Sequence, residues 1–186
     1  MDEEGAVESV AKKSRSKSSP AKPKVSRPNI PGYGMPKTLQ GALTWDWAEK
    51  QLKKSREYWI STVRPDGAPH TMIVWGLWME GGFYFSTGKT SRKARNLAEN
   101  NRCTIGNDDA AAAVIVEGTA EPLTDASTRK QFFPLYEKKY KFDMSNMQGE
   151  PIFTVRPKVA FGLREKDFSS SATRWKFTRK DEKMSS

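Results

Sequence analysis

Residues 58–87 read YWISTVRPDGAPHTMIVWGLWMEGGFYFST, and this stretch decides the fold. Three runs rich in β-branched and aromatic residues are separated by two groups of turn formers, Pro-Asp-Gly at 65–67 and Glu-Gly-Gly at 80–82. Short runs joined by tight turns indicate an antiparallel meander. The predicted strands span residues 58–64, 71–78 and 83–87.

The segments on either side of this meander complete the predicted fold. Helices are expected at residues 44–55, with Thr44 or Asp46 as the cap, at 91–100, with Ser91 as the cap, and at 124–140, with Thr124 as the cap. In the first of them Trp45, Ala48 and Leu52 are spaced for one face. Further strands are expected at 103–106, 112–121, 151–163 and 173–177. The last helix is expected to bury Phe132, Phe133, Leu135 and Tyr136. Six or seven antiparallel strands with two or three short helices indicate an α+β barrel rather than a parallel doubly wound sheet.

The chain of 186 residues fits one domain with short appendages. Residues 1–28 contain no aromatic residue and are rich in Lys, Ser and Pro, so we expect a disordered basic tail. Residues 29–43 are rich in Pro and Gly and are expected to form an extended arm on the surface. The barrel domain is then expected at residues 44–178, followed by a flexible C-terminus at 179–186.

Composition excludes several classes of protein. No apolar run approaches the roughly 20 residues of a membrane span, and the N-terminus lacks a secretory signal pattern. Cys103 and His70 are the only residues of their types, so neither a disulfide nor a His/Cys metal site is expected. The formal charge of +10 favours acidic ligands, but the basic tail lacks the aromatic residues that stack on nucleic acid bases. We therefore expect a cytoplasmic protein without a metal, a membrane partner or a nucleic acid partner.

The sequence contains no self-sufficient catalytic motif. It has no Gly-x-Ser-x-Gly elbow, no phosphate loop of the Walker type and no Gly-x-Gly-x-x-Gly. Cys103 lies within a predicted strand and is interpreted as a small buried apolar residue rather than a nucleophile. If the protein is an enzyme, a bound cofactor is expected to carry the chemistry.

Residues 83–97 suggest where that cofactor binds. A strand ends in Ser86, Thr87 and Gly88, and a helix begins near Ser91. The start of a helix offers free amide donors and a partial positive charge, which suit a phosphate group. A solvated basic face is the alternative. Four cations lie within seven residues of one another: Lys89, Arg92, Lys93 and Arg95.

Five motifs in this order resemble the pyridoxamine 5'-phosphate oxidase-like family of FMN-binding split β-barrels. They are residues 59–70 (from Trp-Ile-Ser-Thr-Val-Arg to His), 74–78 (Val-Trp-Gly-Leu-Trp), 84–88 (Tyr-Phe-Ser-Thr-Gly), 91–97 (Ser-Arg-Lys-Ala-Arg-Asn-Leu) and 116–120 (Val-Glu-Gly-Thr-Ala). Residues 155–160 and 173–177 are similar to the ending of the flavin/deazaflavin (F420)-dependent oxidoreductase branch. The resemblance covers about residues 44–177.

The resemblance implies a homodimer with a flavin-type cofactor in each of two clefts at the subunit interface. The strand residues that would follow the cofactor ring are Met72, Ile73, Val74 and Trp75. The positions that would hold ribityl or phosphate oxygens are Ser86, Thr87 and Gly88, and those that would neutralise the phosphate are Arg92 and Lys93. Asn96 is expected either to contact the same phosphate or to have a structural role in the helix. Arg174 and Trp175 would reach the cofactor of the partner chain, with core packing as the alternative for Trp175.

The implied activity is hydride transfer between F420 or FMN, with F420 favoured, and a small unsaturated or aromatic acceptor. Trp75, Trp78 and Tyr84 are candidate walls of the acceptor site, with barrel core as the alternative, and His70 is a candidate proton donor. Residues 70–75 lack the Arg and Lys that bracket this strand in true pyridoxamine phosphate oxidase, so vitamin B6 oxidation is not expected. A non-catalytic flavin- or haem-binding barrel remains the alternative function.

Overall fold

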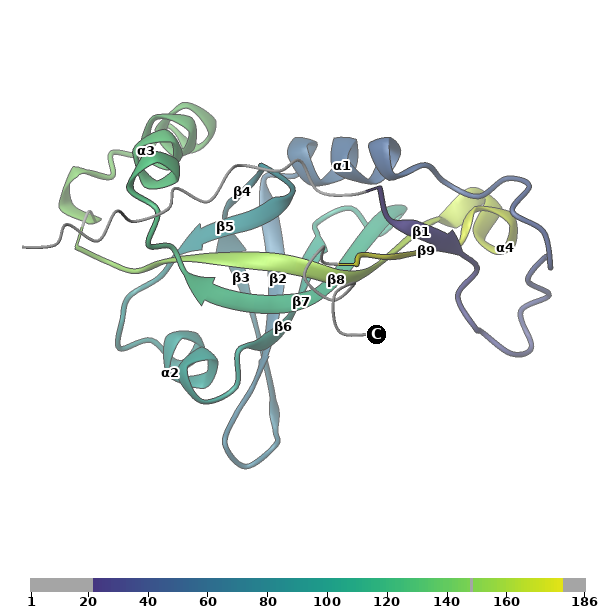
Figure 1. Cartoon of the computed structure of the whole chain (residues 1–186), viewed down its shortest axis with the longest axis horizontal. Coiled ribbons are helices and arrows are strands. Elements are labelled where there is room, and N and C mark those ends of the chain that lie inside the picture. The colour runs from purple at the N-terminus through teal and green to yellow at the C-terminus, as the bar shows by residue number, and fades with distance from the viewer. Residues whose placement is uncertain (1–21, 148, 179–186) are drawn as a thin grey trace, which may run out of the picture.

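The computed structural model describes residues 22–147 and 149–178, which form an antiparallel sheet flanked by helices (Figure 1). The strands are β1 (Lys24–Ser26), β2 (Glu57–Val63), β3 (Pro69–Trp75), β4 (Leu77–Met79), β5 (Gly82–Ser86), β6 (Arg102–Asn107), β7 (Ala112–Pro122), β8 (Ile152–Arg164) and β9 (Thr173–Lys176). The α-helices are α1 (Trp45–Lys54), α2 (Arg92–Glu99), α3 (Ala126–Tyr140) and α4 (Phe168–Ser171), with two short 3-10 turns at Ser145–Met147 and Glu165–Asp167.

The strand order is β1-β9-β8-β7-β6-β2-β3, and β5 adds to β8 while pairing with β4. Every pairing is antiparallel. Within the described residues, β3 ends the path, because it pairs with β2 and lies near β5 without forming a ladder with it. The barrel is therefore split between β3 and β5, and the α+β split-barrel prediction is confirmed.

Two glycines allow the chain to turn closely around β4. Glu80 and Gly81 form the two-residue turn between β4 and β5, and both have a positive φ (48° and 69°). A Cβ on Gly76, between β3 and β4, would lie 2.3 Å from Cζ of Phe83. Only glycine permits the β3–β4 corner to pack directly against β5.

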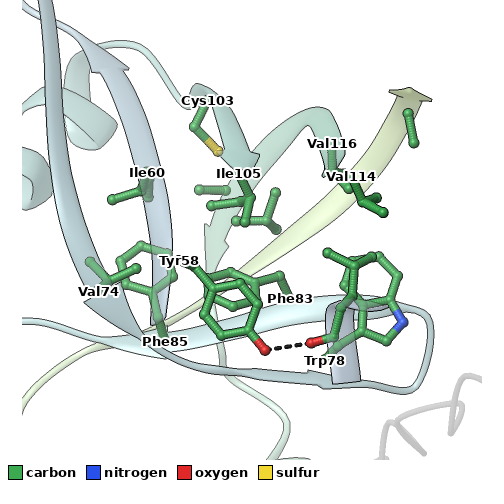
Figure 2. Close-up of a cluster of buried hydrophobic side chains, with 14 of the residues drawn as sticks. Tyr58, Ile60, Val74, Trp78, Phe83, Phe85, Cys103, Ile105, Val114 and Val116 are labelled. Carbon is green, nitrogen blue, oxygen red and sulfur yellow. Dashed lines mark hydrogen bonds between the residues drawn. The ribbon is translucent and has the colours of Figure 1, made fainter. Parts of the chain in front are cut away.

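The main core lies between the inward face of the barrel and α1. Tyr58 and Ile60 of β2 are buried, whereas Trp59 between them is half exposed, as the alternation of a strand requires. On α1, Ala48 and Leu52 are completely buried at the predicted helical spacing. Figure 2 shows core side chains that come from β3, β5, β6 and β7, namely Val74, Phe83, Phe85, Cys103, Ile105, Val114 and Val116.

A second apolar cluster lies under α3. The buried residues of this helix recur every four positions, at Thr128, Phe132, Tyr136 and Tyr140. The predicted stripe is thus wrong for Leu135, which is 45% exposed. Leu135 directly precedes Tyr136 and so lies about 100° around the helix from it, beside the buried stripe rather than in it. The aromatic residues of α3 pack over β4 and β5 at Leu77 and Tyr84, with Met144 and Ile152 completing the cluster.

Several predicted boundaries need correction. Within the described residues there are nine strands and four α-helices, because Gly76 divides the second predicted strand into β3 and β4 and because β1 and α4 were not predicted. Strand β1 lies inside the segment expected to be disordered, but its backbone pairs with β9, where Val25 faces Trp175. The cap of α3 is Asp125 rather than Thr124. The remaining tail (1–21) and the last residues (179–186) lie outside the described part of the chain.

Candidate functional site

Hydroxyl groups gather where β5 passes into α2. Ser91 caps the helix, since its Oγ accepts a hydrogen bond from the Ala94 amide at 3.2 Å, and it lies 3.1 Å from the hydroxyl of Thr87. Ser86 donates to the Pro151 carbonyl at 3.2 Å, which holds this end of β5 against the loop before β8. A Cβ on Gly88 would meet no atom within 4 Å, so the loop borders open space.

The start of α2 has backbone amides that are free to bind an anion. The first amides of a helix have no partner within it. Ser91 takes the Ala94 amide, and no acceptor for the amides of Arg92 and Lys93 is found among the described residues. The positive end of the helix dipole adds to these free amides, and the preceding loop borders open space at Gly88.

Lys93 is the most buried of the four cations around the start of α2. Its side chain is half buried, whereas those of Lys89, Arg92 and Arg95 are exposed. Burial lowers the pKa of Lys93, and no carboxylate of the described residues lies within ion-pair distance of it. An ammonium group that has lost water without gaining a counter-ion is stabilised by a bound anion. The nearest acidic contact of the loop is Glu150, whose Oε2 accepts from the Lys89 amide at 2.8 Å.

Asn96 lies on the face of α2 that packs against the sheet. It is completely buried, and its Nδ2 donates to Oγ1 of Thr62 on β2 at 3.0 Å. The Thr62 hydroxyl in turn donates to the carbonyl of His70 on β3 at 3.3 Å. Of the two roles that the sequence left open for Asn96, these contacts support the structural one. Thr62 was missed, although strand alternation alone places it on the inward face with Tyr58 and Ile60.

Strand β3 pairs with β2, the strand that α2 contacts, and presents a free edge on its other side. Met72 and Ile73 are half exposed, Val74 is buried, and Trp75 is half buried. Because β3 pairs only with β2 among the described strands, the backbone groups on its other side are available to a ligand. The structure thus places the predicted ring strand, 72–75, on an edge with unpaired donors and acceptors.

His70 lies at the start of the same strand. Its side chain is half buried, and its Nδ1 is buried without a hydrogen-bond partner in the described part of the chain. The Oδ1 atom of Asn96 is in the same state. Both residues bind Thr62 through other atoms, His70 through its backbone carbonyl and Asn96 through Nδ2, so each still has one polar atom free to form a hydrogen bond.

Other candidates lie in the core rather than at a ligand site. Trp175 is completely buried and packs edge-on against Trp45 at 5.3 Å, which supports core packing over contact with a partner's cofactor. Arg174, the preceding residue of β9, is only partly buried. Trp78 and Tyr84 are buried as well, so of the three proposed wall residues only Trp75 retains exposed surface.

The outer face of the sheet carries an apolar row. Trp59 is paired with Ile73 on one side and with Gly106 on the other, and Gly106 is paired with Ile115. Trp59 and Ile73 are 49% and 50% exposed. Gly106 adds no side chain to the row, and a Cβ built there would meet only the Cβ of Trp59, at 4.0 Å. An exposed apolar row across four strands is typical of an interaction surface.

One pocket of the described residues lies apart from the predicted site. A pocket of about 510 Å³ lies at the far end of α2 and is lined by Leu97, Ala98 and Phe153 among others, but by none of the predicted site residues. No group of three or more His, Cys, Asp and Glu residues that could hold a metal ion occurs in the described ranges. Within residues 22–147 and 149–178, no helix combines the length and the apolar character that a membrane span requires. Cys103 is buried, and burial raises its pKa to about 12, so it is the inert apolar residue that was predicted.

Solved structures with the same fold include proteins of several kinds. An F420 reductase is 22% identical, with a TM-score of 0.51 over 60% of this chain and 94% of its own. A putative pyridoxamine 5'-phosphate oxidase from Listeria innocua is 18% identical, with a TM-score of 0.56 over 64% of this chain and 98% of its own. HutZ, a heme storage protein from Vibrio cholerae, is 15% identical, with a TM-score of 0.52 over 59% and 86%. At these identities the likeness shows the fold alone.

Sequence comparison identifies the family. No curated protein matches the chain. The family model described as pyridoxamine 5'-phosphate oxidase matches residues 45–163, which include β2–β7, α2, α3 and most of β8. This match spans more than half of the chain and contains both the start of α2 and the free edge of β3. The protein therefore belongs to the pyridoxamine 5'-phosphate oxidase family.

Proposed function

We propose that the protein is an oxidoreductase that transfers a hydride between bound F420 or FMN and a small unsaturated or aromatic acceptor. The observation that carries this proposal is the half-buried Lys93, which lacks a carboxylate partner among the described residues and stands beside the free amides of α2. Both cofactors carry a phosphate group that fits this set of donors.

The donor set suits a phosphate more closely than a carboxylate or a neutral ligand. The available donors are two backbone amides, the Lys93 ammonium group and one hydroxyl of the Thr87–Ser91 pair, since the other hydroxyl donates within that pair. Phosphate oxygens accept several such bonds at once. Arg92, which is exposed on the first turn of α2, adds positive charge from the solvent side.

The β3 edge suits the polar rim of the ring system. Unpaired backbone groups along 72–75 would orient the ring, and Trp75 would flank it with its exposed surface. A bound flavin or deazaflavin supplies the hydride chemistry. The protein would bind the ring, exclude water from one of its faces and leave the other face to the acceptor.

The charge of the chain favours F420 over FMN in this proposal. The formal charge is +10, and F420 carries an acidic polyglutamate tail in addition to its phosphate. One of the structurally similar proteins is an F420 reductase.

The buried, lone Cys103 agrees with a cytoplasmic location, where thiols stay reduced.

We further propose that the active form is a homodimer joined through the outer face of the sheet. The row formed by Ile73, Trp59 and Ile115 is apolar and exposed, and it begins on the strand that borders the proposed ring site. A second copy seated there would cover the row and close the cleft beside β3. Obligate interfaces of this kind commonly bury more than about 2,000 Å².

The second candidate is a non-catalytic barrel that stores flavin or haem. The observation in its favour is His70, whose half-buried ring has an unpartnered nitrogen and is a possible axial ligand. HutZ, which shares the fold, is described as a heme storage protein.

The absorption spectrum of the purified protein tests both candidates. We expect either a deazaflavin band or a two-peaked flavin spectrum, or the appearance of one of them after addition of F420 or FMN. Oxidation of the reduced cofactor by a panel of unsaturated acceptors then tests turnover. A Soret band that is lost in His70→Ala would replace the oxidoreductase proposal with haem storage, and the absence of binding to all three ligands would overturn both.

A further inference from the structure

Four elements meet at the corner between β3 and β4. The corner residue is Gly76, which follows Trp75 at the end of the ring strand. The last turn of α3 contacts Gly76 and also Tyr58 at the start of β2. The Tyr58 hydroxyl in turn contacts the end of α1. Movement at this corner would therefore be transmitted to Trp75 and to the end of the free edge.

Lys139 of α3 lies at the centre of this junction. Its Nζ donates to the hydroxyl of Tyr58 at 2.8 Å and to the carbonyl of Gly76 at 3.0 Å. The ammonium group also lies 4.8 Å from the centre of the Tyr58 ring and 5.2 Å from that of Tyr140. Two acceptors and two ring faces thus surround one cation.

The neighbouring Tyr140 holds the other side of the corner. Its hydroxyl accepts from the Gly76 amide at 2.8 Å and donates either to the Arg56 carbonyl at 2.6 Å or to the Gly76 carbonyl at 2.8 Å. Its ring stacks on that of Trp75, with centres 4.7 Å apart and planes 7° from parallel. The last turn of α3 therefore binds both peptide groups of Gly76 and covers one face of Trp75.

The charged groups around Lys139 do not form an ion pair with it. The carboxylate of Asp108 accepts from the backbone amides of Arg56 and Glu57, and no described carboxylate lies within ion-pair distance of the ammonium group. Burial lowers the pKa of Lys139 to about 8, with attraction to Asp108 and Glu57 and repulsion from Arg56 as smaller effects. Burial raises the pKa of both Tyr58 and Tyr140, so these two phenols stay neutral when the lysine titrates.

We propose that Lys139 is a positioning residue for the cofactor-binding edge, whose ammonium group fixes the Gly76 corner and thereby Trp75, so that loss of its proton loosens the edge. This inference rests on the proposed function and adds to it a control of cofactor affinity by pH. The amine that remains after deprotonation still reaches Gly76 and Tyr58, but its hydrogen bonds are no longer assisted by charge and it gains little from the two rings.

The expected pH profile follows from the direction of titration. Below the pKa of about 8 the ammonium form of Lys139 predominates, and its charge-assisted hydrogen bond to the Gly76 carbonyl fixes the corner. Above it the hold weakens, so the affinity for F420 should fall by about tenfold between about pH 7 and about pH 9.5, a coupling of ordinary size between linked sites. Lys93, whose pKa is also lowered, adds its own decline. The contribution of Lys139 is therefore the difference between the profiles of the wild type and Lys139→Met.

Lys139→Met should fold, because Tyr58 keeps its bonds to the carbonyls of Leu52 and Ser55 and Gly76 keeps those to Tyr140. We expect this variant to bind F420 about tenfold more weakly than wild type at pH 7 and to lose the Lys139 part of the profile. Lys139→Arg, which stays charged throughout the range, should bind with intermediate affinity and a flatter profile. The matched control is Lys138→Met, which removes an exposed cation from the adjacent position and should leave the profile unchanged.

A ligand-free measurement separates this inference from the proposed function. In NMR titrations of the wild type, the Gly76 amide and the Trp75 indole resonances should shift with the same midpoint as the Lys139 side chain, and these shifts should be absent in Lys139→Met. Failure of the wild type to bind either F420 or FMN would overturn the proposed function alone. Static Gly76 and Trp75 resonances during the titration of Lys139, or equal affinity and pH profile in Lys139→Met and wild type, would overturn the positioning role.

Discussion

Replacement of Lys93 by alanine provides the most direct test of the phosphate site. The change removes one charge-assisted contact, while the amides of Arg92 and Lys93 and the Ser91 and Thr87 hydroxyls remain. Hydrogen bonds to a charged group contribute roughly 1.5–3 kcal/mol. At about 1.4 kcal/mol per factor of ten, the affinity should fall by about 10- to 150-fold.

The same structure predicts that Lys93→Ala costs little stability. The side chain forms no ion pair with described residues, and its burial disfavours the ammonium form, so its removal leaves no described partner unsatisfied. Thermal unfolding should therefore occur at the wild-type temperature or slightly above it. A large fall would show that the side chain supports the fold rather than a ligand.

The assay is fluorescence titration with F420 and, separately, with FMN. Lys138→Ala on α3 serves as the control, because it removes an equal charge from an exposed position away from α2. The pH dependence has a definite sign. Because the pKa of Lys93 is lowered in the free protein, affinity should decline as the pH rises through that pKa, and Lys93→Ala should lose the Lys93 part of the decline while keeping the part assigned to Lys139. Equal affinity in Lys93→Ala, Lys138→Ala and wild type would place the phosphate elsewhere and refute the reasoning.

Three further predictions concern the fold and the assembly. Deletion of residues 1–28 should lower the unfolding temperature, because this segment contains the strand that pairs with β9. Arg27→Ala should reproduce most of the loss, since Arg27 donates to four backbone carbonyls. An unchanged melting curve would contradict this prediction. Trp59→Lys should convert a dimer into a monomer in sedimentation experiments, since it places a charge in the middle of the apolar row, whereas a wild type that is already monomeric would remove the dimer proposal. Gly76→Ala should destabilise the protein by about 3 kcal/mol or more, as its Cβ would lie 2.3 Å from Phe83, and chemical denaturation that shows a loss below about 1 kcal/mol would count against the tight corner.

Much of the local structure follows from the sequence because its causes are local. Ser91 caps α2 as predicted, since a hydroxyl just before an amphipathic segment satisfies a free helix amide wherever the helix packs. The turn at Glu80 and Gly81 forms because two residues suffice to reverse the chain between matched strands. The resemblance of residues 84–97 to a known family likewise depends on residues that are close in sequence. The local sequence therefore determines that a strand is followed by a hydroxyl-rich loop and then by the start of a helix with a basic cluster.

What the tertiary structure alone decides is which distant segments become neighbours. Composition marks residues 24–26 as part of a tail, yet they form a strand because the edge of β9 is available to pair with them. Lys138 and Lys139 are indistinguishable in the sequence, but Lys138 is exposed, whereas Lys139, which directly precedes the buried Tyr140, lies over the rings of Tyr58 and Tyr140. Likewise, Lys93 differs from the other cations near the start of α2 only in its burial, which depends on how the helix packs against the sheet. Such differences arise from contacts between residues far apart in the chain, and no local pattern of residue types contains them.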